Sequence, residues 1–446
     1  MPEPLFPYQQ EGARWLTSKS HALLADEMGL GKSAQAIAAV DALASPNPTL
    51  VLCPAVARIN WSREFAKFSK HGWRGNVLLT GASAFDPSAP TTICSYDLAT
   101  ANAAVLSSLS SVQWGSLILD ESHYLKSTDT KRTLAVLGKG GLVHRAVRTW
   151  ALSGTPAPNY PNELWPVLYT FGATRLMYEQ FVERYCVTRH TPYGTKICGG
   201  RNISELRARI APWILRRRKA EVMTDLPPIL FSGMVVEAGP VPEGYIPAGD
   251  LESMAELEPK VAARLDPDAL PTAGAVNSEV RSWHRWVGLQ KVEPVAELIS
   301  AELAAGGYRK IVLFAVHRGV IAELKKRLAP FGAVSLHGGM TPEKRDASIR
   351  RFMSRDDCRV FIGQTTAAGT AISLTAAYQV VFVECDWVPA TNQQAAMRVH
   401  RIGQTMPVTV RVIGLAGSLD ERIQETLRRK TRVLTELFDP VDPFSD

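Results

Sequence analysis

The stretch Ala25-Asp26-Glu27-Met28-Gly29-Leu30-Gly31-Lys32-Ser33 decides the fold, because it has the composition of a phosphate-binding turn between a strand and a helix. The apolar run 21–25 predicts a short buried strand, and the Ala-rich segment 33–43 predicts a helix. The first N–H groups of such a helix, together with the positive end of its dipole, bind phosphate oxygens. Lys32 adds a positive charge, and the Ser33 hydroxyl is a ligand for Mg²⁺.

The turn departs from the eight-residue phosphate-loop pattern, since Asp26 stands where its first glycine belongs. Gly31-Lys32-Ser33 alone is a weak signal, and an ordinary helix start with a flexible entry explains it about as well. The flanking strand and helix favour the phosphate-binding interpretation. The residues that we expect to hold the nucleotide phosphates are Met28, Gly29, Leu30, Gly31, Lys32 and Ser33.

A second charged group follows at Asp120-Glu121-Ser122-His123. Asp120 ends the apolar run 116–119, which places its carboxylate at the carboxyl edge of a buried strand. We expect Asp120 to share the Mg²⁺ ion with Ser33. Glu121 is then the candidate to orient and deprotonate the attacking water. ATP and Mg²⁺ are therefore the predicted cofactors.

Positive charge for the transition state is expected from the segment Gln394…Arg398…Arg401. Two arginines three residues apart on a helix face the same way, so both are predicted to reach the γ-phosphate. The predicted catalytic residues are Lys32, Asp120, Glu121, Gln394, Arg398 and Arg401.

Size and composition set the class of protein. The chain has 446 residues, of which 46% are hydrophobic, enough for two or three domains with their own cores. No apolar run approaches the about 20 residues needed to span a bilayer, and the N-terminus lacks the pattern of a secretion signal. The six cysteines are scattered without a close pair, which predicts buried thiols.

The formal net charge of +7 is modest for this length and identifies no partner by itself. Two dense basic clusters, at 216–219 and 428–432, are typical of segments that bind a phosphate backbone. Exposed helix faces explain each cluster equally well, so both interpretations stay open.

Two series of short apolar runs alternate with helical patterns and predict two α/β lobes with parallel sheets. Residues 161–228 look mainly helical and predict an excursion on the first lobe, whereas the Pro-, Gly- and Ala-rich segment 239–277 predicts a linker or protrusion. The predicted domains are 1–230, 231–291 and 292–446. The expected strands are 50–53, 77–79, 92–95, 117–120 and 149–153, then 311–314, 333–336, 360–363, 379–383 and 408–413.

These motifs, taken in order, make the chain resemble the Swi/Snf-type branch of the helicase superfamily two ATPases. The segments 215–228 and 417–422 look closest to the distant branch of HepA-related annealing helicases. The run Gln394-Ala-Ala-Met-Arg-Val-His-Arg-Ile-Gly-Gln404 is the most diagnostic of the matching segments. The others are 5–16, 53–65, 95–96, 120–123 and 153–156 in the first half, and 337–339, 365–369, 374–377 and 386–389 in the second.

The resemblance implies two RecA-like lobes with ATP between them, in a monomeric translocase on double-stranded or forked DNA that remodels DNA or protein–DNA complexes. It assigns adenine recognition to Gln9 and coupling of hydrolysis to lobe movement to 153–156. The expected DNA contacts are Trp61, Arg318, Thr365 and Trp387, although packing under the Pro389 turn explains Trp387 at least as well. The chain departs from the family at Met397, where an acidic residue is usual, and at 370–371, where glycines are common.

Three other functions stay open at this point. The first is a strand-separating helicase; the second is a nucleic-acid clamp that binds ATP with little turnover; the third is a regulatory switch acting on a protein partner. The expected location is cytoplasmic, in a bacterium or virus, or nuclear, with no membrane partner and a role such as DNA repair. The preferred DNA structure is not encoded in any of these motifs.

Overall fold

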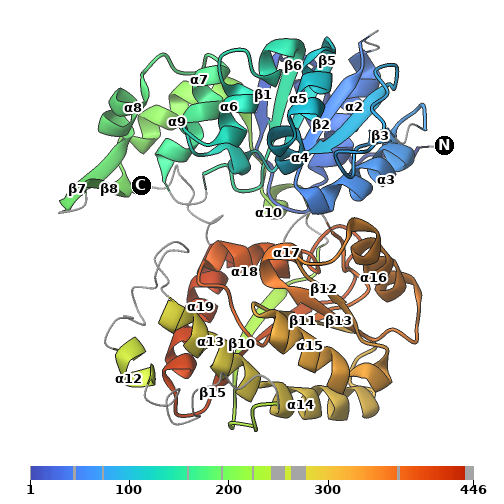
Figure 1. The fold of residues 1–446 in the computed structure, drawn as a ribbon, viewed down its shortest axis with the longest axis vertical. Helices are drawn as coiled ribbons and strands as arrows, with labels where there is room; N and C mark the ends of the chain where they lie inside the picture. The colour runs from blue at the N-terminus through green and yellow to red at the C-terminus, as the bar shows by residue number, and fades with distance from the viewer. Residues whose placement is uncertain are drawn as a thin grey trace. The chain divides into compact units, whose positions relative to one another are not determined.

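The computed structural model describes residues 2–43, 47–72, 75–157, 160–191, 194–223, 226–242, 257–262, 278–368 and 372–436. The chain forms two compact units that divide between residues 224 and 225. Each unit is built around a parallel β-sheet with helices packed on it (Figure 1). The predicted fold class, two parallel-sheet α/β lobes, is confirmed.

The sheet of the first unit has seven strands in the order β3-β4-β2-β5-β6-β1-β9, and all the pairings between them are parallel. β2, β4 and nearly all of β5 are buried without interruption, as a sheet covered on both faces requires. The strands are β1 (His21–Leu24), β2 (Thr49–Cys53), β3 (Asn76–Val77), β4 (Thr91–Ser95), β5 (Trp114–Asp120), β6 (Ala146–Leu152) and β9 (Ile214–Leu215).

Local sequence fixes where several helices of this unit begin. The side chains of Ser95, Asn102 and Thr130 each accept a hydrogen bond from a backbone N–H in the first turn, which is the ordinary N-cap interaction. The helices are α1 (Pro7–Thr17), α2 (Lys32–Leu43), α3 (Arg58–Phe68), α4 (Tyr96–Ala101), α5 (Ala103–Ser110), α6 (Lys131–Leu137), α7 (Trp165–Thr170), α8 (Tyr178–Tyr185), α9 (Ile203–Ile210) and α10 (Lys219–Val222).

The excursion over 161–228 contains helices α7 to α10, but it also contains strands that the sequence did not predict. β7 (Cys186–Thr191) and β8 (Gly194–Gly200) form an antiparallel hairpin that extends beyond α8 (Figure 1). β9 joins the edge of the main sheet beside β1. The glycine-rich β8 has low intrinsic strand propensity, so its conformation comes from pairing with β7 and not from its own composition.

The sheet of the second unit has six strands, all parallel, in the order β10-β15-β14-β11-β13-β12. The strands are β10 (Ile229–Val236), β11 (Ile311–Ala315), β12 (Val334–Leu336), β13 (Val360–Gln364), β14 (Gln379–Phe382) and β15 (Val408–Leu415). The helices are α12 (Leu257–Ala262), α13 (Ser278–Gln290), α14 (Val292–Ala304), α15 (Arg318–Arg327), α16 (Pro342–Ser354), α17 (Thr365–Ala368), α18 (Pro389–Ala396) and α19 (Leu419–Glu436).

The segment predicted to link the lobes differs from the structure at both ends. β10 pairs with β15 in register from Ile229↔Val408 to Val236↔Leu415, so the second unit already includes residues from 229 onward. At the other end, α13 lies in the second unit as well. β10 is an edge strand in which exposed and partly buried residues alternate. It therefore lacks the continuous apolar run by which the buried strands were predicted. Residues 243–256 and 263–277 of the predicted linker lie outside the described residues.

A buried ion pair ties the helices of the second unit to its sheet. Lys291, between α13 and α14, donates through Nζ to the Ile413 carbonyl at 3.1 Å and to Asp420 Oδ2 at 3.0 Å. Asp420 also accepts from the Leu415 N–H and from Gln424. Both charges are removed from water, and such a pair is kept only where its remaining hydrogen bonds are made, as they are here.

Two further expectations concern the whole chain. Cys53, Cys94, Cys186, Cys358 and Cys385 are buried free thiols, as predicted, whereas the Cys198 side chain lies outside the described residues. Within the described part of the chain, no helix has both the length and the apolar character needed to cross a membrane.

Candidate active site

The phosphate loop joins β1 to α2, as the sequence predicts. Its glycines have left-handed backbone angles, with φ of 90° at Gly29 and 73° at Gly31, which disfavour residues with a side chain. A Cβ on Gly31 would also lie 2.4 Å from Nε2 of Gln9. The conformation of the loop therefore favours glycine at positions 29 and 31.

Asp26, the residue that replaces the first glycine, is fully buried and anchors the loop entry. Arg217 donates to it twice, from Nε to Oδ1 at 3.1 Å and from Nη2 to Oδ2 at 2.6 Å. Gln35 of α2 donates to Oδ2 at 3.0 Å. The Arg217 guanidinium also lies 5.4 Å from the Tyr8 ring centre and 3.3 Å from Glu11. Bidentate pairing of this kind is strong and directional, so it holds the loop to α1 and to the segment after β9.

The basic cluster 216–219 is part of the same anchor. Arg216 donates from Nη1 to the Ala25 carbonyl at 3.0 Å, and the Lys219 N–H donates to Glu27 at 2.7 Å. Arg217 and Lys219 are buried, so neither of the two interpretations left open from the sequence describes them. In the second cluster, Arg428 pairs with Glu425 and the side chains of 429–432 lie outside the described residues.

Lys32 is the first residue of α2, and its ammonium group lies inside the loop. Nζ donates to the carbonyl oxygens of Asp26 at 2.6 Å and Glu27 at 3.3 Å. A Cβ added to Gly154, which follows β6, would lie 2.4 Å from Cγ of Met28 and 3.3 Å from Lys32 Nζ. The 153–156 motif therefore lies directly against the phosphate loop, at a distance that only a glycine permits.

Asp120 is the last residue of β5, as predicted, and its side-chain position is fixed by hydrogen bonds. Trp61 Nε1 donates to Oδ2 at 2.7 Å, and the Glu121 N–H donates to Oδ1 at 3.0 Å. Burial and then the neighbouring Glu121 charge raise the pKa of Asp120 to about 7, against the lowering effects of the Trp61 bond and of Lys32. Lys32 and Asp120 lie at the same edge of the sheet, because the phosphate loop follows β1 and Asp120 ends the parallel strand β5.

Glu121 has the left-handed φ of 49°, which is rare for a residue with a side chain and marks a conformation held by its surroundings. The Glu121 carboxylate lies 3.4 Å from Nδ1 of His123, and that nitrogen lies 3.2 Å from Ser153 Oγ. Burial lowers the pKa of His123, so its imidazole is neutral at pH 7. His123 therefore links the candidate base, Glu121, to Ser153 of the 153–156 motif.

The oxygen and nitrogen groups at this edge fit a magnesium nucleotide. A serine hydroxyl at 33 and a carboxylate at 120 are the hard oxygen ligands that Mg²⁺ takes alongside phosphates. The loop N–H groups and Lys32 supply the positive partners for those phosphates. Gln9 is buried, with its amide donating to the Leu30 carbonyl at 3.2 Å and accepting from the Phe6 N–H at 3.0 Å, and its adenine contact stays a prediction.

In the second unit, the helical placement of the two arginines is wrong. α18 carries Gln394 but ends at Ala396, so Arg398 and Arg401 lie in the turns that follow. In this segment, Gln404 Nε2 donates to the carbonyls of Ala377 at 2.8 Å and Val399 at 3.2 Å.

The two arginines nevertheless lie against one segment, 372–374. The Arg398 carbonyl accepts from the Leu374 N–H at 2.9 Å, and Arg401 Nη1 donates to the Ile372 carbonyl at 3.0 Å. Met397, where the family usually has an acid, is buried at the end of α18. Residues 369–371, which include the departure at 370–371, lie outside the described residues.

Three of the four predicted DNA contacts have buried side chains in the structure, and contact with DNA stays a prediction for all four. Trp61 is 1% exposed and binds Asp120, while Thr365 is 0% exposed and donates to the Ala315 carbonyl at 3.2 Å. Trp387 is 8% exposed, with its ring centre 4.9 Å from that of His284. Side chains enclosed in this way position the protein's own groups. Arg318 is exposed and remains a predicted contact.

Two family models match the chain: the SNF2-related domain over residues 8–234, and the helicase conserved C-terminal domain over residues 290–403. The chain belongs to the SNF2-related family. The first match includes the phosphate loop, Asp120 and Glu121, and the second includes Arg398 and Arg401. The recognition made from the motifs is thus confirmed.

This SNF2-related chain also resembles longer proteins. It is 30% identical over 445 residues to the SWI/SNF-related matrix-associated actin-dependent regulator of chromatin subfamily A-like protein 1 of Xenopus laevis, with 96% of this chain and 44% of that protein aligned. It is 28% identical over 441 residues to the human DNA annealing helicase and endonuclease ZRANB3, with 96% and 40% aligned. The chain therefore spans less than half the length of these two relatives.

Among solved structures, the SNF2-related chain is similar to the Sulfolobus solfataricus SWI2/SNF2 ATPase core in complex with dsDNA. The sequence identity is 23% and the TM-score is 0.45, with 100% of this chain and 95% of that chain covered.

The raised pKa of Asp120 predicts how stability depends on pH. The folded protein keeps a proton on this carboxyl that the unfolded chain releases, between about pH 4 and pH 7. The Asp120 contribution to the free energy of unfolding is therefore fully present below that window and is lost as pH rises through 7. Urea unfolding from pH 4 to 8, without Mg²⁺, should show a smaller fall with pH in Asp120→Asn than in the unmodified protein.

The exposed carboxyl of Asp97 provides the control for this measurement, because Asp97→Asn should keep the pH dependence of the unmodified protein. An Asp120→Asn variant with an unaltered slope would show that Asp120 titrates normally.

Proposed function

We propose that this chain is a DNA-dependent ATPase that uses Mg·ATP hydrolysis to translocate on double-stranded DNA and to remodel DNA or protein–DNA complexes, in the manner of fork remodelling or strand annealing. The observation that carries the proposal is the convergence of Lys32, Asp120 and Glu121 at one edge of the first sheet. Family membership and the annealing-helicase name of one relative support the DNA part.

In this mechanism the phosphates of ATP lie on the N–H groups of the loop 28–33. The Lys32 ammonium exchanges its carbonyl partners for phosphate oxygens, which carry more negative charge. Ser33 and Asp120 would hold a Mg²⁺ ion, which would supply positive charge to the nucleotide phosphates. Asp120 would hold the ion as a carboxylate, so the proton that burial favours on this group would have to leave when the ion binds.

Glu121 takes the proton of the attacking water in the hydrolysis step. Its fixed left-handed backbone and the neutral His123 beside it keep the carboxylate in place. Gln9 recognises the adenine from the N-terminal side of the loop. His123 contacts both Glu121 and Ser153. A change in the position of Glu121 during hydrolysis would therefore reach the 153–156 motif through His123.

The second unit contributes Arg398 and Arg401, which stabilise the charge of the transition state on the γ-phosphate. Their shared support on 372–374 makes them respond together when that segment moves. Gln394 of α18 acts beside them. Translocation requires two conformations of the protein that hold DNA with different strength. The nucleotide must bind one of these conformations more tightly than the other, because a ligand with equal affinity for both does not shift the equilibrium between them.

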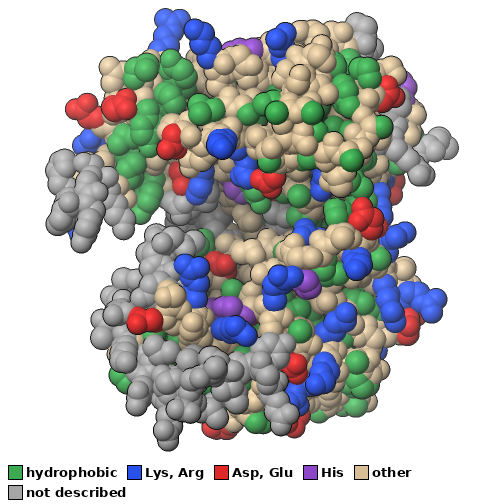
Figure 2. Space-filling view, viewed as in Figure 1, with side chains coloured by type: hydrophobic (Ala, Val, Ile, Leu, Met, Phe, Trp, Pro, Cys, Tyr) green, Lys and Arg blue, Asp and Glu red, His purple; other side chains and the backbone are tan. Residues whose placement is uncertain are grey.

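DNA contact in the second unit falls to exposed cations. Lys and Arg side chains are spread over its visible face (Figure 2), and those exposed on α15 and α16 include Arg318, Lys325, Lys326, Lys344 and Arg350. Contacts of this kind go to phosphates and predict little sequence selectivity. Action as a monomer, in the cytoplasm or nucleus and in DNA repair, belongs to the same proposal.

The proposal is tested by measuring phosphate release with no DNA and with single-stranded, duplex and forked DNA. Duplex or forked DNA should stimulate the rate. Lys32→Ala should abolish turnover by weakening nucleotide binding, whereas Glu121→Gln should abolish turnover while a nucleotide still binds. Glu179→Gln, which changes an exposed carboxylate of α8, should behave as the unmodified protein.

An unchanged rate in Glu121→Gln would reject the assigned base, and the absence of any stimulation by DNA would favour an ATP-binding clamp. Displacement of a triplex strand without unwinding of a tailed duplex would separate a translocase from a strand-separating helicase.

The arginines have a separate signature. Arg398→Ala and Arg401→Ala should each lower the turnover rate by roughly 10³-fold while nucleotide affinity changes little, because the contact forms in the transition state. The exposed Arg355 serves as the matched control, and Arg355→Ala should retain turnover. Equal losses of affinity and rate would contradict the transition-state role.

A further inference from the structure

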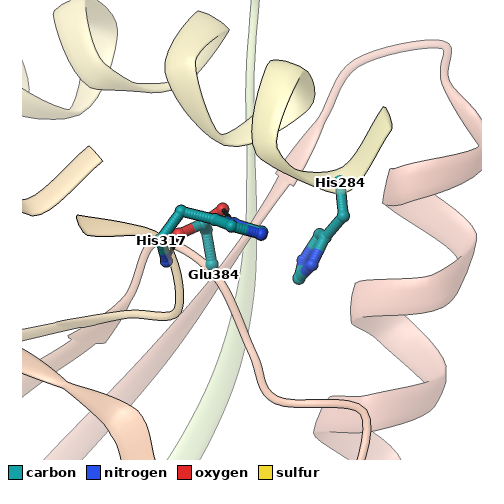
Figure 3. Close-up of side chains that lie close together, drawn as sticks. All are labelled: His284, His317 and Glu384. Carbon is teal, nitrogen blue, oxygen red and sulfur yellow. Dashed lines mark hydrogen bonds and ion pairs between the residues drawn. The ribbon is translucent and has the colours of Figure 1, made fainter. Parts of the chain in front are cut away.

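Three metal-ligating side chains meet in the second unit, apart from the motifs used above. His284 comes from α13, His317 directly precedes α15, and Glu384 follows β14. One donor atom of each lies within 4.8 Å of the other two. Figure 3 shows the His317 ring extending toward His284, with the Glu384 carboxylate beside His317.

Glu384 is fully buried, and its carboxylate is held by three donors. Oε2 accepts from the N–H groups of Val316 and His317, both at 2.9 Å, and Oε1 lies 2.7 Å from His317 Nδ1. Burial alone would raise the pKa of Glu384, but His317 and the backbone donors hold it at about 2. With Nδ1 directed at the Glu384 carboxylate, the other ring nitrogen of His317, Nε2, is the one that can ligate a metal.

His284 supplies an unexplained buried donor or acceptor. Its side chain is 2% exposed, and its Nδ1 has no hydrogen-bond partner within the described part of the chain. The ring lies between those of His317 and Trp387, at centre distances of 5.1 and 4.9 Å. Burial lowers the pKa of His284 to about 4, so the imidazole is in the neutral form that ligates metals. A polar atom left without a partner in the interior is unfavourable and calls for a ligand.

We propose that His284, His317 and Glu384 form a binding site for a divalent transition metal of the Zn²⁺ class. Two imidazole nitrogens and one carboxylate oxygen are a common zinc ligand set, with water completing the coordination. Imidazole ligands disfavour Mg²⁺ and Ca²⁺, which take oxygen ligands. Ligand atoms about 2.1 Å from zinc lie about 3.4 Å from one another in a tetrahedron, so the side chains close around the ion when it binds.

The site would act on the shape of the second unit. Its ligands belong to α13, to the residue before α15 and to the end of β14, which are far apart in the sequence. A bound ion would fix the start of α15, where the proposed DNA contact Arg318 lies. The partly exposed His317 side chain provides the route by which the ion enters.

The test measures zinc bound per chain by the untagged 446-residue chain, using equilibrium dialysis in excess Mg²⁺ so that oxygen sites are occupied. The unmodified protein should bind one more equivalent than His284→Gln or His317→Gln, and Zn²⁺ should raise its melting temperature but not theirs. His144→Gln, which alters an exposed histidine of the first unit, should bind zinc as the unmodified protein does.

Substitution by Co²⁺ gives a second readout, because nitrogen-ligated Co²⁺ of low coordination number absorbs in the visible range. The folded unmodified protein should show these bands, and both variants should lose them. Equal zinc stoichiometry in all four proteins, or no visible Co²⁺ bands in the unmodified protein, would overturn the proposal and leave the three residues as a polar contact. The readout is independent of ATP hydrolysis, so either proposal can fail alone.

Discussion

The buried pair between Asp26 and Arg217 is the interaction on which the candidate site depends. The two residues are 191 positions apart, and their hydrogen bonds join the entry of the phosphate loop to the segment that follows β9. Gly12 of α1 packs so closely here that a Cβ would lie 1.8 Å from Gln35 Oε1. Removing one partner would leave a buried charge unpaired, which is costly. Asp26 thus gives the loop entry side-chain hydrogen bonds that a glycine could not make.

The rest of the site follows from strand order. β5, β6 and β1 are adjacent and parallel, so their carboxyl ends lie at the same edge. Asp120 ends β5, the 153–156 motif follows β6, and the phosphate loop follows β1. Three motifs spread over the first 156 residues are therefore neighbours, and the contacts of His123 and Gly154 join them.

Much of this arrangement could be predicted from the sequence, because buried parallel strands are continuous apolar runs and the charged residues at their ends stand out. What could not be predicted depends on pairing between distant segments. The edge strand β10 alternates in exposure, and Arg217 looked like one member of a basic surface cluster until the structure placed it on Asp26. The hydrogen bond from the indole N–H of Trp61 to Asp120 likewise joins segments that are far apart in the sequence.

Two features of the second unit could not be predicted from local sequence. The helix expected to carry Arg398 and Arg401 stops at Ala396, and Gln404 binds the Val399 carbonyl in the turns that follow. His284, His317 and Glu384 follow no spacing pattern, and only the fold of the second unit brings them together. Local composition predicts strands and loops well. The contacts that a side chain makes with residues distant in the sequence can be assigned only once the topology is known.

The most direct test of this account is the affinity of Arg217→Met for a non-hydrolysable ATP analogue with Mg²⁺, compared with Arg218→Met at the exposed neighbouring position. If the Asp26–Arg217 pair prepares the loop for phosphates, affinity in folded Arg217→Met should fall at least about tenfold, equivalent to about 1.4 kcal/mol, while Arg218→Met should bind normally. A folded Arg217→Met variant with unchanged affinity would contradict the account.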